Sequence, residues 1–186
     1  MSESNSQHNL SVKIKVKNTR GIVRSISPHD FRKKFGVQFT SCLLIDKNCP
    51  PGARASRPLL NPGSVLSQNS NANPLYSDQI RQAVTANIYI GKVSDQVGFG
   101  VFAAEEIQPG QMIGEYTGLA RLKKESDCSN AYIFNYVHNA IIDASKRGNS
   151  MRFVNHSSRN PNASYKRVFV DGVEHVIFLA ERQIAV

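Results

Sequence analysis

The sequence predicts a mostly β domain of several small sheets with short helices, preceded by a basic N-terminal segment. From about residue 86 to residue 186, short apolar segments follow one another and are separated by Gly, Pro and Asn. No stretch of this region keeps the helical spacing of apolar residues for long enough to predict a long helix. Hydrophobic residues make up 40% of the chain and charged residues 20%, which is compatible with a packed core.

The N-terminal part begins with residues 1–11, which are rich in Ser, Asn and Gln and are predicted to be disordered. Residues 12–47 form the basic segment. Apolar residues and lysines alternate strictly from Val12 to Lys17, which predicts a half-buried strand with a cationic outer face. Ser27 is a candidate N-cap for a helix that runs from Pro28 through Phe35, with Gly36 as its C-cap. Residues 37–45 are rich in strand-forming residues.

Residues 48–75 are crowded with Pro, Gly, Ser and Asn, and they are predicted to form a long loop or linker. Ser77 or Asp78 is expected to cap a short helix that continues through Val84, with Ile80 and Val84 on one face. The mostly β domain then occupies residues 86–186.

Charge is concentrated at one end of the chain. Residues 1–60 carry eleven Lys or Arg and three Asp or Glu, a net charge of +8, whereas residues 61–186 carry +1. The basic part, residues 12–57, would favour nucleic acid or an acidic surface, and the alternative is ordinary solvated charge.

Other classes of protein are disfavoured by the composition. The three cysteines have neither CxxC spacing nor an even count, so no zinc site and no disulfide are expected. No apolar run is long enough to span a membrane, and the N-terminus has no apolar signal segment. These features favour an intracellular location, in the nucleus or cytoplasm, with export by a route that reads no N-terminal signal as the alternative.

Three segments are candidates for chemistry, and each also has a purely structural interpretation. The glycines of 98–100 fit a bulge or tight turn, and they lack the flanking pattern of a dinucleotide-binding unit. Tyr116 and Tyr132 lie in strand-like segments, where tyrosines usually pack. Asn155 and His156 follow an apolar pair directly, and buried Asn and His need hydrogen-bond partners, although a polar turn could supply them.

Taken in order, these segments resemble the SET domain, the fold of S-adenosylmethionine-dependent protein-lysine methyltransferases. The resemblance rests on seven segments: Gly98–Phe102, Ile107–Gly118, Ala131–Phe134, Ile142–Ala144, Gly148–Ser157, Asn160–Asn162 and Phe178–Ile184. It implies the β-clip fold of small sheets with a C-terminal pseudoknot. It also implies that S-adenosyl-L-methionine is the cofactor and that the substrate is a lysine-containing basic segment of a protein, such as a histone.

The resemblance implies a role for each matching residue. Val97, Gly98 and Phe99 would lie against the cofactor through their backbone, and Tyr132 would contact its amino-acid end. Asn155 and His156 would contact it from the other side. Tyr116 would line the channel for the target lysine, with Arg152 and Phe153 supporting that wall.

Two departures from the family pattern bear on these expectations. Ser158 stands where many histone-directed relatives have a zinc-binding cysteine, which agrees with the absence of a metal site. The family pattern would continue beyond Val186 with Gly-Glu-Glu and Asp-Tyr-Gly, which hold the main catalytic tyrosine, so the pseudoknot is expected to be incomplete. We therefore expect weak cofactor binding and slow turnover from this chain, which is either a trimmed enzyme or a degenerate SET protein. The alternative function is a non-catalytic module that binds protein or chromatin.

Overall fold

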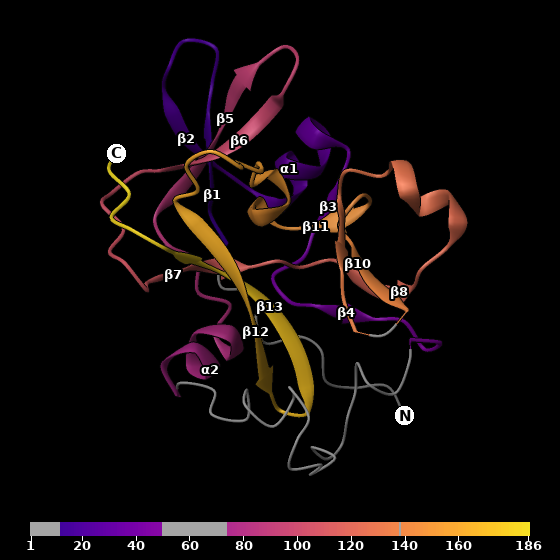
Figure 1. The fold of residues 1–186 in the computed structure, drawn as a ribbon. Helices are drawn as coiled ribbons and strands as arrows, with labels where there is room; N and C mark the ends of the chain where they lie inside the picture. The colour runs from indigo at the N-terminus through magenta and orange to yellow at the C-terminus, as the bar shows by residue number, and fades with distance from the viewer. Residues whose placement is uncertain (1–11, 50–73, 138) are drawn as a thin grey trace, which may run out of the picture.

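The fold is mostly β, as predicted, and consists of small sheets with few helices (Figure 1). The structure is a computed structural model that describes residues 12–49, 74–137 and 139–186. The predicted disorder of residues 1–11 and most of the predicted linker, residues 48–75, lie outside these ranges. The elements are β1 (Ile14–Lys17), β2 (Val23–Ile26), α1 (Pro28–Phe35), β3 (Gln38–Phe39), β4 (Leu44–Ile45), α2 (Pro74–Arg81), β5 (Ile88–Ser94), β6 (Gly98–Ala103), β7 (Met112–Glu115), β8 (Leu119–Leu122), η3 (Glu125–Ser129), β9 (Ile133–Asn135), β10 (Ala140–Asp143), β11 (Arg147–Gly148), η4 (Ser150–Phe153), β12 (Ala163–Val170) and β13 (Val173–Ala180).

The first sheet joins the basic N-terminal segment to the rest of the domain. Its strand order is β2-β1-β5-β6, and Val16 of β1 pairs in parallel with Ile90 of β5. The predicted alternation holds, because Ile14 and Val16 are buried on one face. The strand is shorter than predicted, since Val12 is exposed and precedes β1.

Helix α1 has the predicted caps. The Ser27 hydroxyl accepts a hydrogen bond from the Asp30 amide, and the Asp30 carboxylate accepts one from the Ser27 amide. Gly36 ends the helix with a left-handed φ of 69°, a conformation that costs glycine little. The helix fully buries Phe31, whose ring packs against Phe39 and Phe153.

The strand-rich stretch 37–45 divides into two short strands because its halves join different sheets. β3 pairs with β11, whereas β4 pairs with β8 at the edge of the sheet β4-β8-β10-β9. Local propensity indicated extended backbone here but not the change of sheet.

Helix α2 differs from the prediction, which placed a helix from Ser77 or Asp78 through Val84. It spans Pro74–Arg81 instead, and Val84 is exposed beyond its end. Ala83 has a φ of 52°, which no α-helix accommodates, so the helix ends before it. Ile80 is buried as expected, in a small cluster with Val168 and Ile177.

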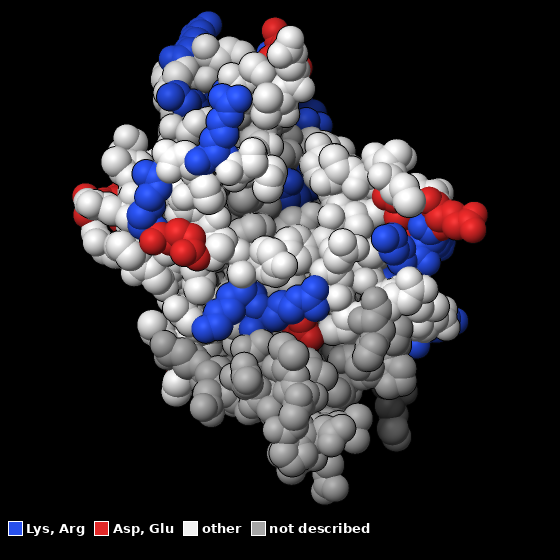
Figure 2. Space-filling model, viewed as in Figure 1, with Lys and Arg blue, Asp and Glu red and all other residues white. Residues whose placement is uncertain are grey.

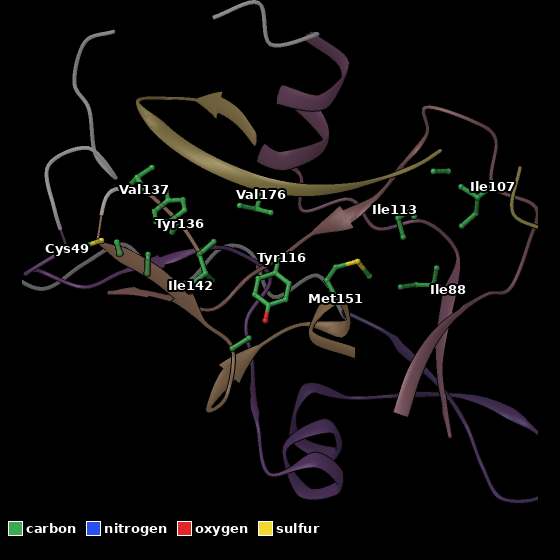
Figure 3. Packing of buried hydrophobic residues seen from close by; sticks show 14 residues of the cluster. Cys49, Ile88, Ile107, Ile113, Tyr116, Tyr136, Val137, Ile142, Met151 and Val176 are labelled. Atoms are coloured by element: carbon green, nitrogen blue, oxygen red, sulfur yellow. The ribbon is translucent and has the colours of Figure 1, made fainter. Parts of the chain in front are cut away.

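The sheet β12-β13-β7 contributes Ile113 and Val176 to the main core. Figure 3 shows Tyr116 within this core, with Ile142, Val176 and Met151 around it. The core therefore extends beneath the strand end at which Tyr116 stands. Among the described residues, no helix is both long and apolar enough to cross a membrane.

Candidate functional site

The β5–β6 hairpin supplies the first part of the candidate site. Its turn is closed by a hydrogen bond from the Val97 amide to the Ser94 hydroxyl oxygen, 3.0 Å away. Gly98 starts β6 with a φ of 80°, a left-handed conformation that L residues rarely adopt. The glycine therefore allows the chain to turn into β6 at this point.

Asn155 is brought directly to this hairpin, although 56 residues separate it from Phe99 in the sequence. Its side-chain amide donates a 3.2 Å hydrogen bond to the Phe99 carbonyl oxygen. A Cβ atom on Gly100 would lie 2.7 Å from Val93 Cγ2 and 3.0 Å from Asn155 Nδ2. Gly100 thus permits a close approach that any larger residue would block.

The short helix η4 positions the segment that leads to Asn155. Asn149 caps it, since its side-chain oxygen accepts a hydrogen bond from the Met151 amide at 3.0 Å. The same side chain donates a 2.8 Å hydrogen bond to the Glu115 carbonyl oxygen at the end of β7. The sequence analysis gave Asn149 no role, although an Asn directly before a short helix is a recognisable capping signal.

Tyr116, Tyr132 and Arg152 form the second part of the site. The Tyr116 hydroxyl donates a 2.9 Å hydrogen bond to the Tyr132 carbonyl oxygen. The Arg152 guanidinium carbon lies 3.6 Å from the centre of the Tyr132 ring, and its Nε donates to the Ala144 carbonyl oxygen at 2.8 Å. Tyr132 is therefore held from two sides by residues that are buried themselves.

Burial sets the electrostatics of this part. Loss of hydration lowers the pKa of Arg152, and it raises the pKa of Tyr116, whose hydroxyl stays protonated. No salt bridge neutralises Arg152 among the described residues. A buried positive charge thus stands beside a partly exposed tyrosine ring, which is an arrangement that attracts an anionic group.

The two parts meet through neighbouring side chains of η4. The Phe153 ring centre lies 6.0 Å from that of Phe99, and the Arg152 guanidinium is 4.8 Å from the Phe153 ring centre. The structure therefore brings Phe99, Asn155, Tyr132 and Tyr116 to one region.

Two of the predicted residues lie in this region only because they adjoin, in the chain, residues that form its contacts. Val97 is exposed at the hairpin turn, and His156 is exposed directly after Asn155. Within the described part of the chain, the Val97 amide bonds Ser94, and the His156 side chain forms no hydrogen bond with the other predicted residues. Their roles stay predictions.

The basic N-terminal segment also supports the site, which the sequence analysis did not anticipate. The Phe35 ring of α1 packs edge-on against Phe99 with a centre-to-centre distance of 5.1 Å. The Phe35 ring centre also lies 4.9 Å from that of Phe153, the residue that links the two parts of the site. The sequence indicated only that Phe35 ends the helix, not which residues it contacts.

A group of aromatic rings packs against Tyr116. The Phe134 and Phe178 ring centres lie 5.5 Å and 6.3 Å from that of Tyr116. Tyr165 packs edge-on against Phe134 and is 55% exposed, so the group reaches the surface. Such a set can receive an extended aliphatic side chain with a cationic end.

Two cavities of the described structure lie away from these residues. One, of about 600 Å³, lies between β1 and the segment that precedes β5, and the other, of about 460 Å³, lies against β1 and β2. None of the predicted cofactor residues lines either cavity. Convergence of residues, rather than cavity size, therefore defines the candidate site.

Comparisons with known proteins agree with this geometry. The SET domain family matches residues 98–186. The histone-lysine N-methyltransferase MEDEA of Arabidopsis thaliana is 30% identical over 151 residues, which cover 77% of this chain and 22% of MEDEA. The chain thus spans about a fifth of the length of that relative.

Solved structures show the same fold. The crystal structure of ATXR5 in complex with histone H3.1 mono-methylated on R26 has a TM-score of 0.61 and 18% identity, covering 84% of this chain and 80% of that one. A Chaetomium thermophilum polycomb repressive complex 2 in an autoinhibited conformation, bound to S-adenosylmethionine, has a TM-score of 0.51 and 25% identity. That match covers 57% of this chain and 15% of the other.

Proposed function

Because residues 98–186 are a SET domain and the chain belongs to the SET-domain family of lysine methyltransferases, we propose that it binds S-adenosyl-L-methionine and methylates a lysine side chain of a protein. The observation that carries the proposal is the junction of Phe99 and Asn155 beside Tyr132. Residues from three distant segments meet there through specific contacts.

The residues at the junction suit the proposed cofactor. When bound, S-adenosyl-L-methionine supplies a methyl group on a positively charged sulfur, which a neutral amine displaces in line. Gly98 leaves the hairpin backbone open to a ligand, since nothing lies within 4 Å of the place where its Cβ atom would stand, whereas Gly100 makes room for Val93 and Asn155. Asn155 holds its amide against the Phe99 carbonyl group, which fixes the shape of this edge.

Arg152 supplies the charge that the amino-acid end of the cofactor needs. Its guanidinium stacks on Tyr132 and lies outside any ion pair of the described residues, so it can attract the ligand's carboxylate. Tyr132, which is partly exposed, would contact that end of the cofactor directly.

The aromatic residues around Tyr116 would receive the target lysine. The Tyr116 hydroxyl is fixed by its hydrogen bond to the Tyr132 carbonyl oxygen, so it links the lysine side of the site to the cofactor side. The fixed oxygen atoms at this point would align a lysine amine that has lost its proton, and alignment is the main requirement of an in-line transfer. A basic, lysine-containing segment such as a histone tail is the proposed substrate, and the nucleus is the proposed location.

Ligand binding provides the first test. Titration of S-adenosyl-L-methionine into the 186-residue chain, followed by NMR, should show binding that weakens about tenfold in Asn155→Ala because a preorganised contact is lost. Gly100→Ala should have a similar effect, since its Cβ atom would displace Asn155. Asn162→Ala is the matched control, because it makes the same change at an exposed position outside the site. Equal affinity of all four proteins would contradict the proposed cofactor site.

Methyl transfer separates an enzyme from a binding module. Transfer of a radiolabelled methyl group to histone H3, but not to a histone in which every lysine is replaced by arginine, is the expected result. Cofactor binding without any transfer would favour the non-catalytic module. Transfer to the lysine-free histone would contradict lysine as the target.

A further inference from the structure

A second surface lies on the opposite face of the β2-β1-β5-β6 sheet. Side chains alternate along β1, so that Ile14 and Val16 point into the core while Lys15 and Lys17 point outward. Figure 2 shows blue side chains over the part of the molecule where Figure 1 places β1, β2 and β5. The cationic face predicted from the sequence is therefore present on the folded domain.

This face is hollowed and has an excess of positive charge. A cavity of about 460 Å³ is lined by Lys15, Lys17 and Arg24, and no Asp or Glu side chain lines it. Among the described residues, none of these three cations takes part in a salt bridge. Lys15 donates a hydrogen bond to the neutral side chain of Asn87, which leaves its charge uncompensated.

Aromatic rings stand beside the cations. Tyr89 lines the cavity, and its ring stacks on that of Phe102 with centres 5.3 Å apart and an angle of 14° between the planes. The Lys17 ammonium lies 5.6 Å from the centre of the Tyr89 ring. Phe102 is 38% exposed, so this stacked pair is accessible from solvent.

We propose that this basic and aromatic cavity binds single-stranded nucleic acid, with phosphates at Lys15, Lys17 and Arg24 and a base against Tyr89. Proteins that bind single strands combine a cationic groove with aromatic rings on which bases stack. A cavity of about 460 Å³ falls within the usual size range for a small-molecule site, so it can hold a nucleotide unit. An acidic peptide would use the charges but would gain little from the flat ring.

The proposed cavity shares no lining residue with the candidate methyltransferase site. Phe99 and Phe153 pack with Ile14, Val16 and Ile90 on the inner face of this sheet, whereas the cavity lies on its outer face. Binding of nucleic acid can therefore be tested without any assumption about the cofactor or the target lysine.

Fluorescence anisotropy with a labelled ten-nucleotide oligouridylate tests the proposal on the 186-residue chain. Three phosphate contacts predict a slope of about −2 for the logarithm of the association constant against the logarithm of the salt concentration. The affinity should therefore fall about 15- to 20-fold between about 50 mM and 200 mM salt. The double variant Lys17→Gln/Arg24→Gln should lower the slope to about −0.7. Lys123→Gln, which removes an exposed charge directly after β8, is the control and should leave both slope and affinity unchanged.

The aromatic contact has its own test. Tyr89→Leu keeps an apolar side chain but removes the flat ring, so affinity should fall about 5- to 100-fold, whereas Tyr89→Phe should bind like the wild type. Circular dichroism checks that each variant is folded. The proposal would be overturned in favour of an acidic protein partner by two results together. A peptide of eight glutamates would compete for the site as well as the unlabelled oligonucleotide does, and Tyr89→Leu would keep the wild-type affinity. Equal weakening by Lys123→Gln would overturn it in favour of non-specific charge attraction.

Discussion

Replacing Asn149 with alanine removes both hydrogen bonds that its side chain makes beneath the candidate site. Asn149 is 7% exposed, so water cannot replace its partners readily. Loss of a helix cap costs about 1 kcal/mol, and a buried carbonyl group left without a donor costs about 1–3 kcal/mol. We therefore expect Asn149→Ala to lower the free energy of unfolding by about 2–4 kcal/mol.

Urea denaturation followed by circular dichroism measures this loss. The chain has no tryptophan, so far-ultraviolet ellipticity is the better signal. The midpoint should shift to lower urea with an unchanged m value, because the folded state loses bonds without changing how much surface unfolding exposes. Asn162→Ala, an identical change at an exposed position, should stay within about 0.5 kcal/mol of the wild type.

The same variant also tests the link between stability and the site. Because η4 leads directly to Asn155, loss of its cap should weaken S-adenosyl-L-methionine binding even where the protein is fully folded. A stability loss below about 0.5 kcal/mol would refute the structural part of this reasoning. A large stability loss with unchanged cofactor affinity would refute the positioning part.

Two further predictions concern buried charges. His175→Ala should lower the free energy of unfolding in urea by about 1–3 kcal/mol, because the buried Glu115 carboxylate loses its hydrogen bond with His175 Nδ1, 2.7 Å away. His175→Gln should recover part of this loss. Equal stability of His175→Ala and the wild type would contradict the prediction. Acid should destabilise the protein between about pH 4 and pH 2, because hydrogen bonds from Arg121 lower the pKa of Asp127 to about 2, below the value of about 3.9 in an unfolded chain. The contribution is complete above about pH 4 and is lost as the pH falls through the lower pKa. Arg121→Gln should flatten this part of the stability profile, and parallel profiles for the two proteins would show that the pair does not contribute.

Much of the local structure could be predicted from the sequence because it depends on neighbouring residues. The capping box of α1 and its C-terminal glycine are encoded within ten consecutive positions, 27–36. The alternation in β1 and the short apolar segments after residue 86 indicate strands in the same way. The order of the SET-like segments was visible for a related reason, since each is a short run of consecutive residues.

Local signals failed where tertiary contacts decided the outcome. Residues 37–45 have strand propensity throughout, but their two halves pair with different sheets. Helix α2 begins earlier than expected and ends before Ala83, whose left-handed backbone no propensity scale indicated. The Tyr76 hydroxyl of this helix donates a hydrogen bond to the Gly110 carbonyl oxygen. The two residues are 34 positions apart, so no local sequence pattern could predict this contact.

The sequence by itself determined the fold class, the caps of α1 and the cationic face of β1, and it named the residues from which the candidate site is proposed. Only the tertiary structure decided that Asn155 donates a hydrogen bond to the Phe99 carbonyl oxygen, that Arg152 stacks on Tyr132, and that Phe35 packs against Phe99 and Phe153. The physical reason is the range of the interactions. Capping and alternation act within a few residues, whereas the site depends on packing and hydrogen bonds between segments that only the folded sheets bring together.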